Sequence, residues 1–418
     1  MSEILSAIPL ARLTVCLTAA AVVGASLVSV SHDAADAAGA CRIQTSTKLD
    51  STTHFAGGAV LRRYTAHAQG AAKGGYDQTG KVIMASYPRD SFPALINTRV
   101  GMRETVGAMA KQQRRRSLGA INGDFFIFPD VGGETDIEMS RGPMIRNGRV
   151  IRATAQPQRV VGVTKKRHPF GGMFAVRGTV RAEGSSKSTK IRSMNWQNIK
   201  GGGVNIYTSA WSDTIPRPKG RLEWVLNDRN VIRKVRSPAR NNAERGDSVR
   251  SGTRVLAFSK NATSAVRGTN PGTKVFVNLR QSTDTGVELY TAVGRGLPLV
   301  LNGVAAPLGC SAYAHSKAAR PRTFVGWNAK GSWRSFTVPG KTFDGIGLRT
   351  GGFGLANAAN IAKSLGMRRA YELDGGGSTT MWTRSKTGQW TRRDLYGVNT
   401  AVCACQRPMT NGLAFVQR

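Results

Sequence analysis

A short segment near the C-terminus, reading ELDGGGST, contains two carboxylates at a spacing that could support catalysis. The residues Arg369–Asp374 predict a strand, and alternate residues of a strand share a face. Glu372 and Asp374 are therefore expected to project to the same side. Asp374 would lie at the carboxyl end of the strand, a common place for catalytic groups above a sheet. We regard Asp374, with Glu372 beside it, as candidate catalytic residues.

The residues after Asp374 suit the binding of phosphate oxygens. Three glycines let the backbone turn tightly and approach a ligand closely, namely Gly375, Gly376 and Gly377. Their N–H groups, with the hydroxyls of Ser378 and Thr379, predict a cradle for a phosphate group. A structural turn after a buried strand is the alternative, because a glycine run alone is weak evidence. The acid before the run and the hydroxyls after it favour a functional site.

Two further segments carry polar residues next to apolar strands. The segment Ile121–Phe126, reading INGDFF, places Asn122 and Asp124 in a turn, and its aromatic residues suit the lining of a sugar site. An ordinary Asn-Gly turn is the alternative. Arg322 and Thr323 begin another apolar run, and a guanidinium group suits bidentate binding of a phosphodiester. A solvated surface arginine is the alternative there, since 60 residues are Lys or Arg.

The net charge points to an anionic partner. The chain of 418 residues carries 60 Lys and Arg against 24 Asp and Glu, a net charge of +36, and such a surface attracts polyanions. Nucleic acid is one candidate, but the sequence contains no Cys/His finger, basic zipper or aromatic-basic RNA-binding motif. We expect a phosphorylated or anionic glycan, or association with the cell envelope, rather than nucleic acid. A general solubility or adhesion trait is the alternative, because the charge is spread along the chain.

The N-terminus predicts export. An uncharged run, Leu13–Val30, precedes the small-residue stretch Ala34–Ala40. This layout is typical of a secretory signal peptide over residues 1–40, cleaved at its end. The alternatives are an uncleaved membrane anchor, because the run is about long enough to span a bilayer, and lipidation at Cys41. We therefore expect a secreted or cell-envelope protein.

Cys16 lies in the expected leader, and the rest of the chain has an even number of cysteines, as in exported chains that form disulfides. They are Cys41, Cys310, Cys403 and Cys405. Cys403 and Cys405 are too close in sequence to pair easily with each other. Each is expected to pair with Cys41 or Cys310. A metal site is the competing interpretation, but no histidine lies near Cys403 or Cys405.

The pattern of apolar residues predicts an α+β fold, with a mixed central sheet, packed helices and a β-rich antiparallel middle region over residues 155–300. A basic amphipathic helix is expected over Thr98–Arg116, ended by Gly119. A second helix is expected over Gly354–Leu365. Further strands are expected at Val82–Tyr87, Phe336–Val338 and Asn411–Val416, and Ala120–Phe126 is expected to run from a buried strand into a turn.

Taken in order, these segments resemble the phosphodiester glycosidase family. The run DGGGST of residues 374–379 is the most specific match. The other matching stretches are Ile121–Phe126, Asn205–Trp211, Gly296–Val300, Arg322–Gly326, Gly354–Leu365 and Asn411–Val416. Because they run through almost the whole mature chain, the resemblance implies a single phosphodiester glycosidase-like domain over residues 41–418, which includes the β-rich region.

The resemblance implies hydrolysis of a sugar-1-phosphodiester at the anomeric carbon, releasing sugar and a phosphate monoester. Arg322 and the backbone of Gly375–Thr379 would stabilise the charge of this leaving group. Asp374 would activate water or stabilise an oxocarbenium-like centre, with Asp124 or Glu372 as the second carboxylate. The residues expected to bind substrate are Asn122, Arg322, Thr323, Gly375, Gly376, Gly377, Ser378, Thr379 and Asn411.

Two positions depart from the family pattern. The family commonly has Asn-Gly-Gly before its aromatic pair, whereas Asp124 follows Gly123 here, and it commonly has Asn at the position of Glu372. Both changes add a carboxylate, which leaves the substrate open. No cofactor is assigned, and the added carboxylates leave room for a divalent metal ion. The runner-up interpretation is a non-catalytic envelope or exopolysaccharide-associated protein that binds anionic glycans through its basic surface.

Overall fold

The computed structural model describes residues 43–70, 77–97, 99–113, 117–127, 138–196, 202–242, 244–266, 268–306, 308, 318–340, 351–395 and 406–418. These residues lie within one unit of the chain, Ala40–Arg418. They form sheets of eight, eleven, five and two strands. The expected leader and the four cysteines of the predicted disulfides lie outside the described residues.

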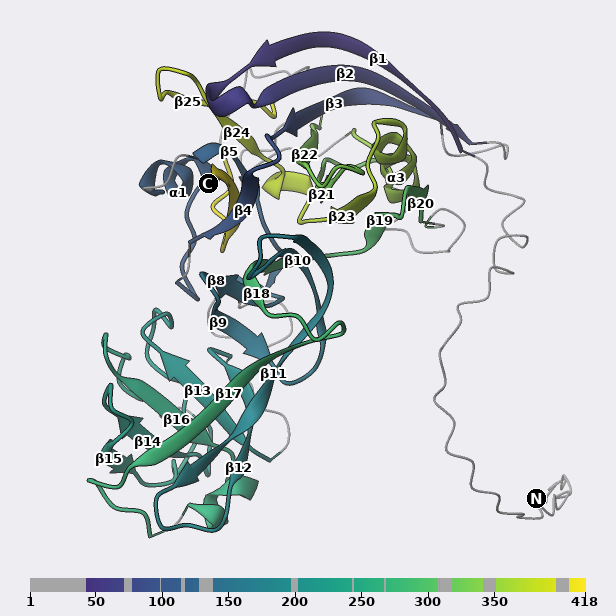
Figure 1. Cartoon of the computed structure of the whole chain (residues 1–418). Helices are drawn as coiled ribbons and strands as arrows, with labels where there is room; N and C mark the ends of the chain where they lie inside the picture. The colour runs from purple at the N-terminus through teal and green to yellow at the C-terminus, as the bar shows by residue number, and fades with distance from the viewer. Residues whose placement is uncertain are drawn as a thin grey trace, which may run out of the picture. The chain divides into compact units, whose positions relative to one another are not determined.

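The eight-stranded sheet is antiparallel throughout and carries two of the predicted site segments. Its long first strands run side by side in Figure 1. The last residues of β23 and the first residues of β21 face the candidate site. The strands, in spatial order, are β1 (Ile43–His54), β2 (Val60–Gly70), β3 (Gln78–Ser86), β22 (Trp333–Val338), β21 (Arg322–Trp327), β23 (Arg369–Glu372), β19 (Pro298–Leu301) and β20 (Val304–Ala305).

The five-stranded sheet is also antiparallel and carries the other two site segments, at the end of β5 and the start of β26. Its strands are β25 (Trp390–Arg392), β24 (Met381–Arg384), β5 (Ser117–Asn122), β26 (Gly412–Gln417) and β4 (Ser91–Ile96). A separate two-stranded sheet, β6 (Phe126–Ile127) with β7 (Met139–Ser140), follows the Asp124 turn.

The eleven-stranded sheet contains the strands predicted for the middle region, antiparallel except for the parallel pair β12–β13. Alternating apolar and polar residues give many of these strands one buried face, as in the pattern of β12. The strands are β15 (Ile232–Arg236), β14 (Leu222–Leu226), β16 (Arg254–Phe258), β13 (Val204–Thr208), β12 (Thr189–Met194), β9 (Arg149–Thr154), β8 (Met144–Arg146), β18 (Leu289–Gly294), β10 (Gln158–Thr164), β11 (Pro169–Ala182) and β17 (Val275–Thr283).

The predicted α+β class is wrong, because strands dominate the described residues and only two α-helices occur among them. The helix α3 (Leu355–Ser364) matches the predicted one and buries Leu355, Ala358 and Ile361 against the eight-stranded sheet. Figure 1 shows α3 beside this sheet. No helix among the described residues is long and apolar enough to cross a membrane.

Within the described part of the helix expected over Thr98–Arg116, residues 99–113, only α1 (Val106–Gln112) is helical. Val100 and Glu104 form β-bridges with other parts of the chain instead. Gly119 does not end the helix but lies inside β5, where it pairs with the neighbouring strands. A short helix gains little stability by itself, so backbone pairing with distant segments overrode the helical periodicity of this segment.

Candidate active site

Strand ends from two different sheets meet at the candidate site. β23 ends at Glu372, while β5 ends at Asn122 and β26 begins directly after Asn411. The Asp374 N–H donates to the carbonyl of Gly123 at 3.0 Å and ties the eight-stranded sheet to the five-stranded one. The fold thus brings together residues that lie about 250 positions apart in the sequence.

Asn122 holds this junction together. Its side chain is fully buried, and its Nδ2 donates to the backbone carbonyl of Asp374 at 2.7 Å. Its Oδ1 accepts from the Thr323 hydroxyl at 2.8 Å and from the Thr380 N–H at 3.1 Å. Because the buried Asn122 amide and the Thr323 hydroxyl bind protein groups, the geometry makes both residues positioning groups for Asp374.

The glycine loop after Asp374 is the short 3-10 turn η4 (Gly376–Ser378). Gly376 has a φ of +58°, in the left-handed region that favours glycine, and its N–H donates to the Pro321 carbonyl at 2.9 Å. A Cβ on Gly375 would lie 2.7 Å from the same carbonyl. The loop therefore packs directly on the chain that leads into β21, which places it next to Arg322.

The Thr379 hydroxyl and the Asn411 Nδ2 are buried polar groups of the predicted site without a hydrogen-bond partner within the described residues. Such groups are rare in folded proteins and call for an explanation, which at a functional site is often a ligand. The other end of the Asn411 amide is used, because its Oδ1 accepts from the Asp124 N–H at 2.9 Å.

Asp374 is a partly exposed carboxylate in an unusual electrostatic environment. Burial raises its pKa to about 7. The Ser378 hydroxyl and the Gly375 N–H, which donates to Oδ1 at 2.9 Å, act in the opposite direction and lower this pKa. The Arg407 charge also lowers it, whereas the Asp124 charge raises it. Asp374 can therefore change protonation near neutral pH, as a general acid or base must.

Glu372 is engaged differently, although it lies only two residues away. Its carboxylate forms a buried ion pair with Arg322, with 3.3 Å between Oε1 and Nη1. Its Oε2 accepts from the Leu297 N–H at 3.2 Å. The Arg322 guanidinium also donates to the carbonyls of Phe353 and Ala318, and its burial lowers its pKa. The pair therefore anchors Arg322 at the edge of the site.

The Asp124 carboxylate is enclosed by neighbouring protein groups. Its Oδ2 accepts from the Ser140 hydroxyl at 2.7 Å and from the Gly142 N–H. Burial is the main influence on its pKa and raises it, while these two hydrogen bonds lower it. A Cβ at Gly142 or Gly294 would lie 2.8 or 2.3 Å from Oδ2, so the carboxylate fits because both residues are glycine.

A buried arginine lies behind Asp124. Arg152, in β9, is fully buried, and its Nη1 donates to the Gly142 carbonyl at 2.8 Å. Its guanidinium lies 3.7 Å from the ring centre of Trp196. Burial lowers the pKa of Arg152 to about 9, and the Asp124 charge raises it. Arg152 and Ser140 were not predicted from the sequence, because neither lies in a motif and both come close to Asp124 only in the folded chain.

Two cavities flank Phe125, which lines both. One has a volume of about 500 Å³ and is lined by Asp374, the glycine loop, Arg320, Arg322 and Arg407. The other has a volume of about 580 Å³ and is lined by residues that include Asp124, Arg141, Arg159 and Arg295. Each cavity thus combines one carboxylate of raised pKa with three arginines.

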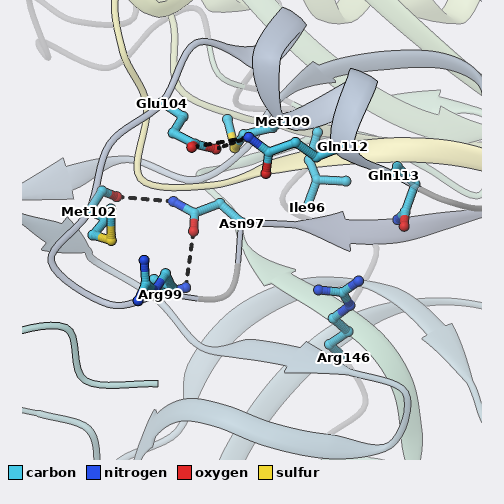
Figure 2. Close-up of a pocket in the computed structure, with 9 residues that line it drawn as sticks. All are labelled: Ile96, Asn97, Arg99, Met102, Glu104, Met109, Gln112, Gln113 and Arg146. Carbon is cyan, nitrogen blue, oxygen red and sulfur yellow. Dashed lines mark hydrogen bonds between the residues drawn. The ribbon is translucent and has the colours of Figure 1, made fainter. Parts of the chain in front are cut away.

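A smaller cavity of about 220 Å³ lies beside α1 and contains none of the predicted site residues. Figure 2 shows Asn97, Glu104 and Gln112 among its lining residues. The Glu104 carboxylate accepts hydrogen bonds from Gln112 Nε2 at 3.2 and 3.4 Å. Asn97 holds the neighbouring loop through the Met102 carbonyl. These contacts describe a structural pocket, and we centre the site on Asp374 and Asp124.

No group of three or more His, Cys, Asp or Glu side chains within the described residues is arranged to hold a metal ion. The added carboxylates Glu372 and Asp124 are instead engaged with Arg322 and with Ser140 and Gly142.

Comparison with known proteins supports the resemblance predicted from the sequence. Residues 221–416 match the family described as phosphodiester glycosidase. This range includes Arg322, Glu372, Asp374 and Asn411, whereas Asp124 lies before it. No curated protein matches the chain.

Two solved structures share the fold at low identity. A hypothetical protein from Synechocystis has a TM-score of 0.66 and 16% identity, over 91% of this chain and 68% of that chain. A protein from Burkholderia pseudomallei has a TM-score of 0.63 and 15% identity, over 90% of this chain and 96% of that chain. The catalytic domain of zebrafish N-acetylglucosamine-1-phosphodiester alpha-N-acetylglucosaminidase has a TM-score of 0.41 and 14% identity, over 90% of this chain and 84% of that chain.

Proposed function

Proceeding from the match of residues 221–416 to the phosphodiester glycosidase family, we propose that this protein hydrolyses a sugar-1-phosphodiester at the anomeric carbon. The products are a sugar and a phosphate monoester. One observation carries the proposal: Asp374 has a pKa of about 7 and lines a cavity flanked by three arginines. This combination supplies a group that titrates near neutral pH beside a site for an anion.

The phosphate side of the substrate is assigned to the Asp374 cavity. The exposed Arg320 side chain makes no hydrogen bond or ion pair within the part of the chain that the structure describes. Arg407 is close enough to affect the charge of Asp374, and Arg322 is anchored by Glu372. Guanidinium groups bind phosphate oxygens in a charge-assisted, often bidentate manner. They would stabilise the charge that develops on the leaving phosphate.

Asp374 is assigned to the chemistry at the anomeric carbon. A phosphate monoester leaves with little protonation, so the ionised carboxylate of Asp374 would activate water or stabilise an oxocarbenium-like centre. Asp124 is the second carboxylate, because its charge interacts with that of Asp374. Glu372 is assigned the positioning of Arg322, since the two form a buried ion pair.

The enzyme is proposed to act outside the cytoplasm, on glycans of the cell envelope or the extracellular space. The support comes from the signal-like leader and from the net charge of +36, which attracts anionic polymers.

The test is a product assay with the mature protein on a panel of sugar-1-phosphodiesters, including UDP-sugars. Both free reducing sugar and phosphate monoester are measured for the wild type and for Asp374→Asn. The matched control is Asp90→Asn, because Asp90 is an exposed aspartate outside the site. We expect equimolar products from the wild type and the control, and a loss of about 10³-fold in the Asp374 variant.

Two outcomes would contradict the proposal. Equal activity of Asp374→Asn and the control would remove Asp374 from the chemistry. Salt-dependent binding of anionic glycans without release of any product would instead support a non-catalytic glycan-binding protein.

A further inference from the structure

The cavity on the Asp124 side of Phe125 is as basic as the cavity on the Asp374 side. Its volume is about 580 Å³, and Arg141, Arg159 and Arg295 line it. Phe125 separates it from the phosphate side assigned above, since the same residue lines both cavities.

Two of these arginines offer their guanidinium groups to the cavity without a protein partner. Arg141 and Arg159 are both exposed, and neither side chain makes a hydrogen bond or an ion pair within the described ranges of the chain. Their backbones are nevertheless held in place. The Arg141 backbone N–H donates to the Phe125 carbonyl at 2.7 Å, and the Arg159 carbonyl accepts from the backbone N–H of Arg295 at 3.2 Å. The two cations therefore sit on anchored backbone next to Phe125.

The third arginine is fixed by the fold. Arg295 donates from Nε to the Val160 carbonyl at 3.1 Å and from Nη1 to the Gly296 carbonyl at 3.0 Å. Its guanidinium lies 4.2 Å from the ring centre of Tyr371. Burial lowers its pKa to about 10, and the charges of Arg159 and Arg369 lower it as well, whereas Tyr371 and Asp284 raise it. A half-buried cation next to a like charge is an arrangement that an anion relieves.

The only carboxylate that lines this cavity, within the described residues, does not neutralise the three arginines. Asp124 carries at most one negative charge against three guanidinium groups, and the buried Arg152 behind it interacts with the same charge. The cavity walls therefore keep an excess of positive charge.

In a chain with 60 Lys and Arg residues, exposed arginines are usually solvated surface groups. Three features separate this set from that background. One of the three is anchored and half-buried, all three line one cavity, and that cavity adjoins Phe125 and a carboxylate of the site.

We propose that the cavity of Arg141, Arg159 and Arg295 binds a second phosphoryl group of the same substrate. The substrate class is then a sugar that carries a phosphodiester at its anomeric carbon and another phosphate at a distal hydroxyl, as in a chain of sugar phosphates. The sugar ring would lie across Phe125, whose face suits the apolar face of a sugar. This inference rests on the proposed function and adds the substrate's second charge to it.

The test uses three synthetic substrates with the same aglycone. One has an uncharged sugar, one carries a phosphate at the distal hydroxyl, and one carries a carboxylate there, as in a uronic acid. The variant is Arg141→Gln/Arg159→Gln, and the matched control is Arg177→Gln/Arg229→Gln, which removes two exposed arginines elsewhere. The readout is the ratio of kcat/KM for the phosphorylated substrate to that for the uncharged one.

We expect the kcat/KM of the wild type and of the control for the distally phosphorylated substrate to exceed that for the uncharged one at least about tenfold. In Arg141→Gln/Arg159→Gln, this ratio should fall about 10- to 100-fold. The preference should also shrink at high salt. An unchanged ratio in the variant would overturn the subsite. A stronger preference for the uronate would overturn the phosphoryl assignment.

Failure of the proposed function can be told apart from failure of this subsite. If the wild type hydrolyses none of the three substrates, the hydrolysis proposal fails, and binding of a sugar 1,6-bisphosphate by calorimetry then decides the subsite. Weaker binding in Arg141→Gln/Arg159→Gln than in the control pair supports it, and equal binding in both overturns it.

Discussion

The two cavities beside Phe125 contain similar charged groups, but their carboxylates, Asp374 and Asp124, lie in different environments. On both sides a carboxylate has a raised pKa and faces three arginines. Asp374 lies between β23 and η4, is partly exposed, and titrates near neutral pH. Asp124 is buried between two glycines, with Ser140 and Arg152 around it. Asp374 is therefore the group suited to gain and lose a proton during the proposed reaction, whereas the charges around Asp124 are held in place by the fold.

The largest expected effect comes from the chemistry of Asp374. Asp374→Asn should lower kcat on a sugar-1-phosphodiester by about 10³-fold, because an amide cannot act as the base or stabilise positive charge as a carboxylate does. Steady-state kinetics with circular dichroism as the fold control provide the measurement. If Asp124→Asn proves far more damaging than Asp374→Asn, the roles of the two sides are reversed.

The next effect concerns the buried ion pair on the Asp374 side. Arg322→Ala should lower the free energy of unfolding by about 3–5 kcal/mol, because it leaves the buried Glu372 carboxylate unpaired. Arg322→Leu combined with Glu372→Leu should recover much of this loss. Denaturant unfolding of the three proteins measures both. A loss below about 1 kcal/mol for Arg322→Ala would show that the pair is not desolvated in solution.

The pH dependence follows from the raised pKa of Asp374. Activity should rise as the pH increases through about 7, because the ionised form is the one assigned to the reaction. Stability should move the other way. The folded pKa lies above the unfolded value of about 4, so the folded state binds the proton more tightly. This stability is fully present below about pH 4 and is lost as the pH rises through about 7.

Asp374→Asn removes this linkage. The variant should be more stable than the wild type at pH 8 by about 1–3 kcal/mol, and the difference should vanish near pH 4. Thermal unfolding at the two pH values is the measurement. A variant that is less stable at pH 8 would argue against a desolvated Asp374.

The smallest expected effect concerns the hydrogen bond between Ser140 and Asp124. Ser140→Ala removes a hydrogen bond that lowers the pKa of Asp124, so that pKa should rise further. We expect a loss of about 0.5–1.5 kcal/mol in the free energy of unfolding and a modest shift of the pH profile. The pH profile is compared with that of Ser237→Ala, an exposed serine outside the site. A large shift would mean that Asp124, and not Asp374, sets the pH profile.

Much of the local structure could be predicted from the sequence. The strands at Arg369–Glu372 and Gly412–Gln417 and the helix α3 follow from apolar patterns and turn residues. The fold class could not be predicted from the sequence. The extent of α1, for example, was decided by β-bridges from Val100 and Glu104 to distant segments. Such non-local pairing is invisible to periodicity.

The same division holds for the site. The carboxylates Asp374, Glu372 and Asp124 were identified by residue type and spacing, but their different environments were not. Glu372 and Asp374 are separated by a single residue, yet one is paired with Arg322 and the other is not. The burial that raises a pKa and the partner that neutralises a charge both depend on which strands pack nearby.

The available chemical groups can be identified in the sequence: the acid and glycine run of ELDGGGST, the Asn122 turn, Arg322 and the basic composition. Tertiary structure alone decided that Asn122 ties two sheets together, that Arg152 lies behind Asp124, and that two arginine-lined cavities meet at Phe125. The physical reason is that charge, burial and hydrogen bonding act over a few ångströms in space. Residues about 250 positions apart reach that range only when their strands are packed side by side.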